Sequence, residues 1–133
     1  MDPTQIIATL QGPNYRVLLD DGHHTWIGDE PTSAGGGDRG PTPFALLISS
    51  LGTCTAITVK MYAERKGWPL EHVDVRLSFE TQADGSTIGR EVVLYGELDD
   101  AQRERLLQIA NACPVHKVLS KPIVIRTNLA AVV

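Results

Sequence analysis

The longest uncharged stretch of the chain predicts a helix that offers no obvious surface to water. Residues 44–59 carry no charged side chain, whereas a surface helix normally has one polar face. Thr42 followed by Pro43 predicts the start of this helix, because a threonine oxygen can cap free N–H groups and proline suits the first turn. Gly67 predicts its end, since glycine adopts the left-handed backbone that often closes a helix. We therefore expect a long central helix that is buried nearly all round.

The length of this helix matters for how the chain can bury it. At ~1.5 Å per residue it would span roughly 34 Å, which is about the diameter of a compact globule of this chain length. One subunit can hardly wrap it alone. Cys54 lies in the middle of the helix, where its thiol would meet little solvent. By three- and four-residue spacing, it shares a helical stripe with Leu47, Leu51, Ile57, Thr58 and Met61.

Three short apolar segments before the helix predict an antiparallel meander. Residues 5–10 and 15–19 are separated by a Gly-Pro-Asn cluster, which is typical of a turn. Residues 23–27 follow an Asp-Asp-Gly turn and would add a third strand. Residues 32–40 are glycine-rich and polar, which leaves two interpretations open: a flexible linker, or a mobile loop beside a site.

Further strands are predicted after the helix. Residues 73–80 alternate apolar and polar side chains, a period of two that indicates a strand with one wet face. An Asp-Gly turn then predicts that residues 90–98 return as the partner strand. Residues 123–128 predict a last strand.

Two short helices are expected between the strand pair and the last strand. Asp99 would cap a helix over residues 100–112. Pro114 would interrupt that helix and open a second one over residues 115–120, because proline tolerates a first turn but not a helix interior. The whole pattern predicts an α+β fold.

Composition narrows the class of protein. The chain has 133 residues, of which 42% are hydrophobic, so we expect one globular domain over residues 1–133 with a real core. The net charge of −4 and the scattered Lys and Arg residues argue against a nucleic-acid or anionic-membrane partner. The N-terminus lacks a basic region followed by an apolar run, and the uncharged segment is short for a bilayer span. We expect a soluble, cytoplasmic protein.

The two cysteines are the first candidates for chemistry. Cys54 alone is weak evidence, because a free cysteine on an apolar helix can simply act as a small hydrophobic residue. Cys113 lies immediately before Pro114 at a helix–helix junction, where free N–H groups can lower a thiol pKa. In a reducing compartment a disulfide between them would be transient. The pair suits a peroxidatic thiolate that becomes a sulfenic acid and a resolving thiol that condenses with it.

A reactive Cys54 would need a cation nearby, because an apolar pocket raises the pKa of a thiol. Arg16 is the first candidate, since it lies in an otherwise apolar predicted strand. The alternative is that its guanidinium reaches water from an edge strand. Arg39 in the glycine-rich loop is the reserve candidate.

His116 leaves two other kinds of site open. It follows Cys113 by three residues, so the two could form half of a metal site, but no close Cys or His pair supplies the remaining ligands. A Cys-His acyl-transfer enzyme with His116 as the base is also conceivable, although the sequence shows neither a nucleophile elbow nor a third member.

The sequence resembles a known family in two long segments. They are GPTPFALLISSLGTCTAITVKMYAERKGWPL around Cys54 and NACPVHKVL around Cys113, and YRVLLDDGHHTWIGDEP adds to the likeness. They resemble the family of osmotically inducible protein C and organic hydroperoxide resistance proteins. Within it, the chain is most similar to an uncharacterised branch with a Cys-Pro-Val-His motif.

This resemblance implies a fold, an activity and roles for three residues. It implies an intertwined homodimer with two long helices at its centre, flanked by sheets from both chains. It also implies thiol-dependent reduction of organic hydroperoxides, with Cys54 peroxidatic, Cys113 resolving and Arg16 activating the thiolate. A dithiol, such as a lipoyl group on a protein, would regenerate the enzyme. No metal, haem or flavin is expected.

One position departs from the family pattern. The best-studied members carry a glutamate ten residues before the first cysteine, which holds the arginine over the thiolate, and this chain has Phe44 there. Glu30 or Asp38 could substitute for that glutamate. Without it, Cys54 would be less reactive or act on another substrate. The alternative function is therefore a redox-sensing or small-ligand-binding protein with little turnover.

Overall fold

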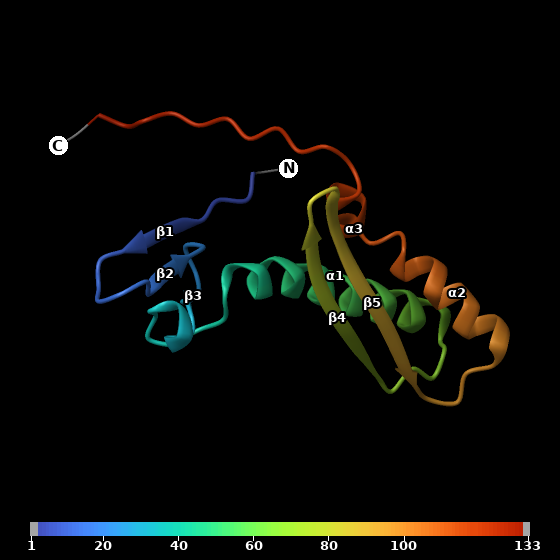
Figure 1. Cartoon of the computed structure of the whole chain (residues 1–133). Helices are drawn as coiled ribbons and strands as arrows, with labels where there is room; N and C mark the ends of the chain where they lie inside the picture. Colours follow the sequence, from blue (N-terminus) through green and yellow to red (C-terminus); the bar gives the residue numbers. More distant parts are fainter. Residues whose placement is uncertain (1–2, 132–133) are drawn as a thin grey trace. The chain divides into compact units, whose positions relative to one another are not determined.

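The computed structural model describes residues 3–131 and contains two compact units. The first unit holds the residues up to Ser50 together with residues 78–88, and the second holds residues 51–77 and those from Gly89 onward. The elements follow one another in the order shown in Figure 1. They are β1 (Ile7–Leu10), β2 (Val17–Asp20), β3 (Thr25–Gly28), the 3-10 helix η1 (Thr32–Ala34), α1 (Pro43–Lys66), β4 (His72–Gln82), β5 (Gly85–Tyr95), α2 (Asp100–Ala110) and α3 (Pro114–Leu119).

The first unit contains the expected three-stranded antiparallel meander. β2 lies in the middle and pairs with β1 on one side and β3 on the other. In this register Leu19 lies opposite Ala8 of β1 and Trp26 of β3. The strands begin about two residues later than the sequence pattern suggests, so Arg16 directly precedes β2 instead of lying within it.

The glycine-rich loop after β3 is tied to a buried carboxylate. Asp29 is 3% exposed, and its side chain accepts hydrogen bonds from the backbone N–H groups of Glu30 at 2.7 Å and Arg39 at 3.1 Å. Gly36 must be glycine, because a Cβ there would overlap the carbonyl of Glu30. These contacts describe a loop packed back on the end of β3, and the interpretation as a plain flexible linker is wrong.

Both predicted ends of α1 are confirmed. The hydroxyl Oγ1 of Thr42 accepts a hydrogen bond from the backbone N–H of Ala45 at 3.2 Å, which caps the first turn that begins at Pro43. Gly67 follows the last helical residue with φ of 72°, in the left-handed region that glycine adopts freely.

Only one stripe of α1 is buried within the single chain. Its buried residues recur every fourth position: Leu51, Thr55, Val59 and Ala63. Val59 and Ala63 form the core of the second unit with Leu70 and with the α2 residues Leu106 and Ala110. Other faces stay open, because the side chains of Ile57 and Met61 are 53% and 64% exposed. The expectation of burial nearly all round is therefore not met by one copy of the chain.

The apolar content of α1 also bears on the membrane prediction. By length and composition this helix of 24 residues could cross a membrane, with a mean hydropathy of 1.5 over its best window, of which 17% is buried. The helix is longer than the uncharged segment considered in the sequence, so its length alone does not exclude a membrane span. A core helix of a soluble protein meets the same criteria, so this property does not separate the two classes.

The two short helices are confirmed, and each has a local cap. The Asp99 carboxylate accepts from the backbone N–H of Gln102, and the Gln102 side chain accepts from the backbone N–H of Asp99, which is a capping box at the start of α2. α2 ends two residues earlier than predicted. Cys113 is the N-cap of α3, and Pro114 is its first residue.

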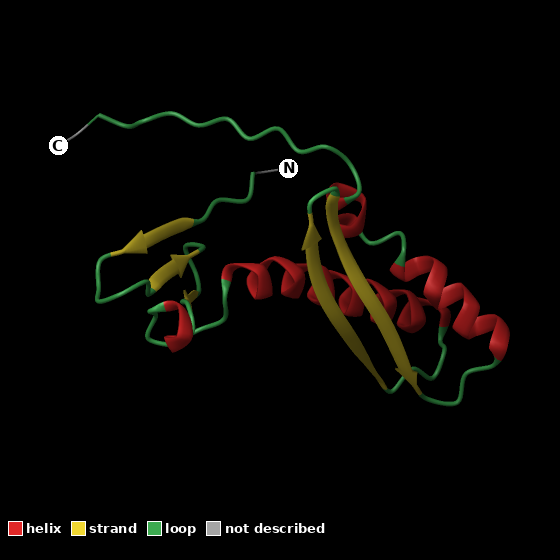
Figure 2. Ribbon diagram, in the orientation of Figure 1, coloured by secondary structure: helices red, strands yellow, loops and turns green. Residues whose placement is uncertain are grey.

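The last strand predicted over residues 123–128 is wrong for the single chain. Figure 2 shows this segment as loop, without pairing to any strand. Its large apolar side chains are exposed, with Val124 71% and Ile125 84% exposed. A strand is held by hydrogen bonds to a neighbouring strand, and no sheet edge is paired with this segment.

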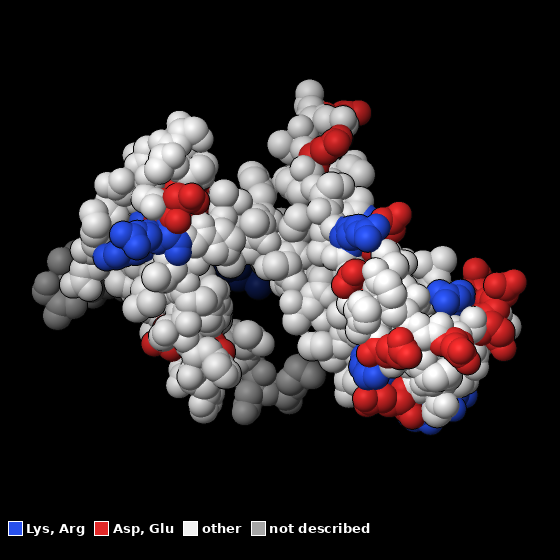
Figure 3. Space-filling model, turned by 90° about the horizontal axis from the view of Figure 1, so that it is seen from below, with Lys and Arg blue, Asp and Glu red and all other residues white. Residues whose placement is uncertain are grey.

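Charged side chains on the surface are mixed in sign. On the face shown in Figure 3, Lys and Arg lie among Asp and Glu. For example, an ion pair joins Arg76 of β4 to Glu91 of β5 at 3.0 Å. That no nucleic acid binds stays a prediction.

Candidate thiol site

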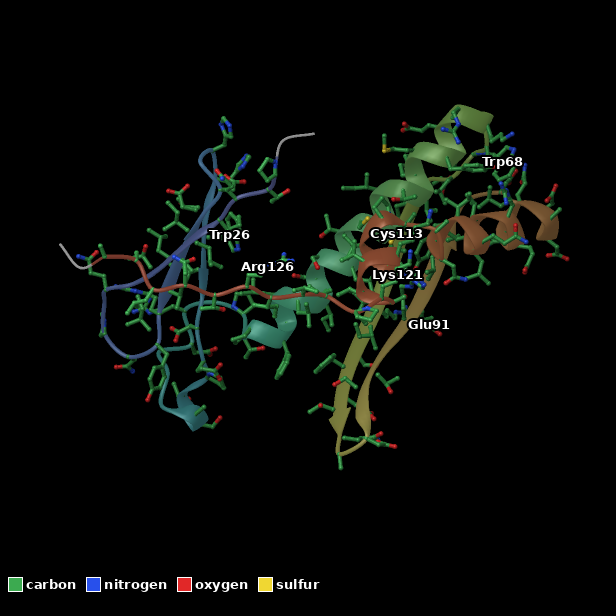
Figure 4. All side chains as sticks on the ribbon, turned by 90° about the horizontal axis from the view of Figure 1, so that it is seen from above. Trp26, Trp68, Glu91, Cys113, Lys121 and Arg126 are labelled. Atoms are coloured by element: carbon green, nitrogen blue, oxygen red, sulfur yellow. The ribbon has the colours of Figure 1, made fainter. Side chains whose placement is uncertain are left out.

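Two free thiols from distant parts of the sequence meet in the second unit. Cys54 lies mid-way along α1 and is half-buried, whereas Cys113 at the N-cap of α3 is fully buried. Figure 4 labels Cys113 where the start of α3 lies against α1. The Cys54 thiol is one of the neighbouring groups that lower the pKa of the Cys113 thiol, and its own Sγ atom is 3.9 Å from Oγ1 of Thr58. The structure therefore brings the two predicted cysteines together in their reduced form.

Thr55 lies beside the Cys113 thiol and connects it to the strand β5. Its hydroxyl Oγ1 is 3.7 Å from the Cys113 Sγ atom and donates to the carbonyl of Leu51 at 2.7 Å. The same oxygen accepts a hydrogen bond from Nη1 of Arg90 at 3.0 Å. A hydroxyl provides one donor and two acceptor positions, so Thr55 can join these groups in one network.

Arg90 of β5 is the cation of this site. Its guanidinium donates to three neutral acceptors: Oγ1 of Thr55, Oδ1 of Asn111 at 2.9 Å and Nδ1 of His116 at 2.8 Å. Among residues 3–131, no Asp or Glu forms an ion pair with it. A half-buried positive charge is therefore held beside a thiol and has no carboxylate partner within the described chain.

The surroundings of Cys113 lower its pKa. Burial acts in the opposite direction and raises the pKa, because a low-dielectric interior disfavours the charged form. Three interactions lower the pKa and together outweigh burial. The largest is the hydrogen bond from the backbone N–H of His116, at 3.4 Å, and the side chains of Thr55 and Cys54 provide the other two. The charge of Arg90 adds to the same effect. The fully buried thiol of Cys113 is thus stabilised as a thiolate.

Sequence reasoning missed Arg90, although the pattern carried a signal. Positions 90, 92 and 94 share one face of a strand because side chains alternate with a period of two. Val92 and Leu94 pack against the core of the second unit, so Arg90 lies on the same inward face. An arginine in line with core residues is the sign that could have found it.

Arg16 and Arg39, the two predicted activating cations, belong to the first unit, whereas both cysteines belong to the second. Arg16 lines a pocket of about 580 Å³ together with Thr9, Gln11, Gly12, Leu18 and Ile27. That Arg16 or Arg39 serves the Cys54 thiolate stays a prediction.

The charge of Arg16 acts on the carboxylate of Asp29 and lowers its pKa. Burial raises the pKa of Asp29, but hydrogen bonds from three backbone N–H groups and then the charge of Arg16 outweigh it, so the pKa is lowered. Neither Glu30 nor Asp38, the two candidates from the sequence, holds this buried position. Phe44, which stands where a clamping glutamate was expected, stacks on Phe79 with ring centroids 4.7 Å apart.

His116 is held by Arg90. Because a guanidinium only donates, Nδ1 of His116 is the acceptor of their hydrogen bond. Within residues 3–131, no group of three or more His, Cys, Asp or Glu residues is placed to hold a metal ion. The ring nitrogen Nδ1 therefore serves neither a metal nor a thiol in this arrangement.

Known structures share this fold at low sequence identity. A putative osmotic stress induced and detoxification response protein from Psychrobacter arcticus has a TM-score of 0.75 and 22% identity, over 89% of each chain. An OsmC-like protein from Mycoplasma pneumoniae has a TM-score of 0.78 and 17% identity, over 90% of this chain and 88% of the other. The organic hydroperoxide resistance protein OhrB of Bacillus subtilis has a TM-score of 0.62 and 20% identity, over 88% and 90%.

These similarities establish the fold and not the activity. No curated protein sequence matches the chain. A family model described as OsmC-like protein matches residues 35–128, a range that includes α1 with Cys54 and the Cys113–Pro114 junction. Because this match covers well over half of its length, the chain belongs to the OsmC-like protein family.

Proposed function

We propose that the protein is a cytoplasmic, thiol-dependent peroxidase that reduces organic hydroperoxides. The Cys54 thiolate attacks the outer peroxide oxygen, the O–O bond breaks, and the alkoxide takes a proton and leaves as an alcohol. Cys54 is then a sulfenic acid. The Cys113 thiolate attacks its sulfur, the S–O bond breaks, and hydroxide takes a proton and leaves as water. A dithiol, such as a lipoyl group carried by a protein, reduces the disulfide and is oxidised itself.

One observation carries this proposal: the Cys54 thiol is near enough to Cys113 to lower the pKa of its thiol, although the two come from α1 and the N-cap of α3. Thiols in contact can form a disulfide with little backbone movement. The apolar side chains of α1 favour an organic substrate over hydrogen peroxide, and one structural neighbour is named an organic hydroperoxide resistance protein. We assign activation of Cys54 to Arg16, with Arg39 as reserve.

The proposal includes an intertwined homodimer in which residues 1–133 form one domain. The open faces of α1 support it, because large apolar side chains such as Phe44, Ile57 and Met61 are more than half exposed in one copy. A second copy that packs its own α1 against these faces would remove them from water.

Intact-mass analysis after treatment with cumene hydroperoxide tests the proposal. The wild-type protein should lose the mass of two hydrogen atoms as the disulfide forms, and Cys113→Ser should show no such loss and accumulate oxygen on Cys54 instead. Cys54→Ser should remain unoxidised under the same treatment. A wild-type protein that keeps both free thiols, or goes straight to sulfinic acid, would contradict the mechanism.

Phe44 favours a second candidate function. It stands at the sequence position where the best-studied members of the family carry the glutamate that holds an arginine over the thiolate, and it stacks on Phe79 instead. A redox sensor or small-ligand-binding protein of this family would form one disulfide and stop. Steady-state turnover with dithiothreitol or a lipoyl donor separates the two functions, because only a peroxidase consumes hydroperoxide in excess of its own thiols.

A further inference from the structure

We propose that Arg90 is a positioning residue that keeps Cys113 ready, as a thiolate, to attack the sulfenic acid of Cys54. This inference rests on the proposed function and concerns its second step, the formation of the disulfide. It gives a role to a cation that neither the sequence pattern nor the proposed activation of Cys54 uses.

The contacts of Arg90 point to an anion beside it. Its three hydrogen-bond partners, Thr55, Asn111 and His116, are all neutral acceptors. Cys113, two hydrogen bonds away through Thr55, is a neighbouring group that can become an anion. A cation fixed by several hydrogen bonds in a partly buried place stabilises a nearby anion more than a mobile surface cation does.

The hydroxyl of Thr55 transmits this effect. It has a single proton, and Arg90 donates to one of its lone pairs. The proton can therefore point to the Leu51 carbonyl or to the Cys113 sulfur, both within reach of Oγ1. While Cys113 is a thiol, the hydroxyl can donate to Leu51; once Cys113 is a thiolate, the proton can turn to the sulfur. Arg90 thus holds Thr55 where it can serve the thiolate.

Three elements contribute the groups that act on the titration of Cys113. α1 contributes the Cys54 thiol and the Thr55 hydroxyl, β5 contributes the Arg90 cation, and α3 contributes the backbone N–H of His116. The ring of His116 faces Arg90 through Nδ1. Arg90 is the only fixed charge in this set.

Burial assigns Arg90 to the second step of the reaction and not to the first. Cys113 is fully buried, and Cys54 is only half-buried. A hydroperoxide therefore meets Cys54, and the Cys113 thiolate meets only the sulfenic acid that Cys54 becomes. In that step Cys113 supplies the electron pair of the new S–S bond, and the Cys54 S–O bond breaks to release water after proton uptake.

The first test measures the thiolate of Cys113 directly. In a Cys54→Ser background, Cys113 is the only cysteine, and the ultraviolet absorbance of its thiolate is followed against pH. Adding Arg90→Gln should move this titration to higher pH, because the fixed charge is lost. Arg76→Gln, which removes an exposed arginine of β4, is the matched control and should leave the titration unchanged. An unchanged titration in Arg90→Gln would overturn the inference.

The second test separates the two chemical steps by stopping the reaction with a sulfenic-acid trap at increasing times. In Arg90→Gln, the sulfenic acid should form at the wild-type rate, but the disulfide should form about tenfold more slowly, as expected when one charge-assisted hydrogen bond is lost. Sulfinic acid should build up in its place. Arg90→Lys should recover part of the rate, and Arg76→Gln should behave as wild type.

The outcomes separate this inference from the proposed function. If wild type forms the disulfide and Arg90→Gln forms it equally fast, the inference fails and the peroxidase stands. If wild type forms no disulfide, the proposed function fails, and the role of Arg90 in that step fails with it. Should Arg90→Gln not fold, Thr55→Val, which keeps the side-chain shape and removes the hydroxyl, must show the same slower disulfide formation.

Discussion

Two charged side chains, Asp29 and Arg90, make hydrogen bonds that connect parts of the chain, and the sequence pattern predicts neither set of contacts. Asp29 ties the glycine-rich loop to the end of β3. Arg90 connects β5 to α1, to the end of α2 and to α3. Hydrogen bonds to a charged group are stronger than those between neutral groups, so single substitutions at these residues should have local and measurable effects.

Asp29→Asn should destabilise the protein at neutral pH and remove a pH dependence. The folded pKa of Asp29 lies below its ordinary value, so its carboxylate stabilises the fold above the unfolded pKa of about 3.9. That contribution is lost as the pH falls through the lowered native pKa. Thermal melts across acid pH should therefore differ most between wild type and variant near neutrality and converge at low pH.

The control for Asp29 is an acidic residue of the same loop. Asp38 is exposed and has a φ of 56°, a conformation that asparagine tolerates well. Asp38→Asn should melt close to the wild-type temperature at every pH. Equal losses in the two variants would show that the buried carboxylate has no special role.

The sequence predicted the two thiols of the site, but it did not predict that Arg90 of β5 is the cation near them. Cys54 and Cys113 are found from their rarity and from the Cys-Pro junction, which are local signals. Arg90 acquires its role only when β5 is packed against α1, and that depends on tertiary structure. Its alternation with Val92 and Leu94 indicated an inward side chain, yet no local pattern says which thiol an inward arginine will meet.

At the scale of elements, the predictions that depend on caps and turns are confirmed. Thr42 and Gly67 bound α1, and Asp99 caps α2. Each of these effects involves residues within one helical turn, so the sequence carries the information. Strand boundaries were less accurate, because pairing with a neighbour decides where a strand begins.

Asp99→Ala should lower the free energy of unfolding by about 1 kcal/mol, the usual value of an N-cap side chain. The carboxylate accepts from the Gln102 backbone N–H at 2.7 Å, and the reciprocal bond closes the capping box. Denaturant unfolding measures the difference. Asp100→Ala removes the same charge one residue later, where no cap exists, and should cost clearly less; a cost equal to that of Asp99→Ala would contradict the role of the cap.

The segment of residues 123–128 shows where element prediction from sequence fails. Its β-branched residues favour a strand, but a strand also needs a partner edge, and the single chain does not supply one. The prediction for helix α1 fails in the same way. Its sequence indicates burial on all sides, but one chain buries only one stripe of the helix. Both discrepancies concern surfaces that one copy leaves open.

At the scale of the whole molecule, the exposed apolar surface should determine the oligomeric state. Met61→Glu places a charge on an exposed face of α1, where it would be buried in the proposed homodimer, and should convert the dimer to a monomer. Light scattering coupled to size-exclusion chromatography measures the mass of each variant. Glu64→Lys alters an exposed charge in the last turns of α1 and should remain dimeric.

A wild-type protein that is monomeric over the micromolar range would contradict the proposed homodimer, whatever the behaviour of Met61→Glu. A monomeric wild type would also leave the exposed residues of α1 and of the C-terminal segment in water, which is the usual mark of an interaction surface for another molecule.

The full burial of Cys113 has a consequence for how the oxidised protein returns to its starting state. In the proposed mechanism, an incoming dithiol would reach the sulfur of Cys54, so the mixed disulfide would form there and Cys113 would be the leaving group. A thiol whose pKa is lowered leaves faster. The contacts that lower the pKa of Cys113 would thus speed the return of the disulfide to two thiols as well as its formation.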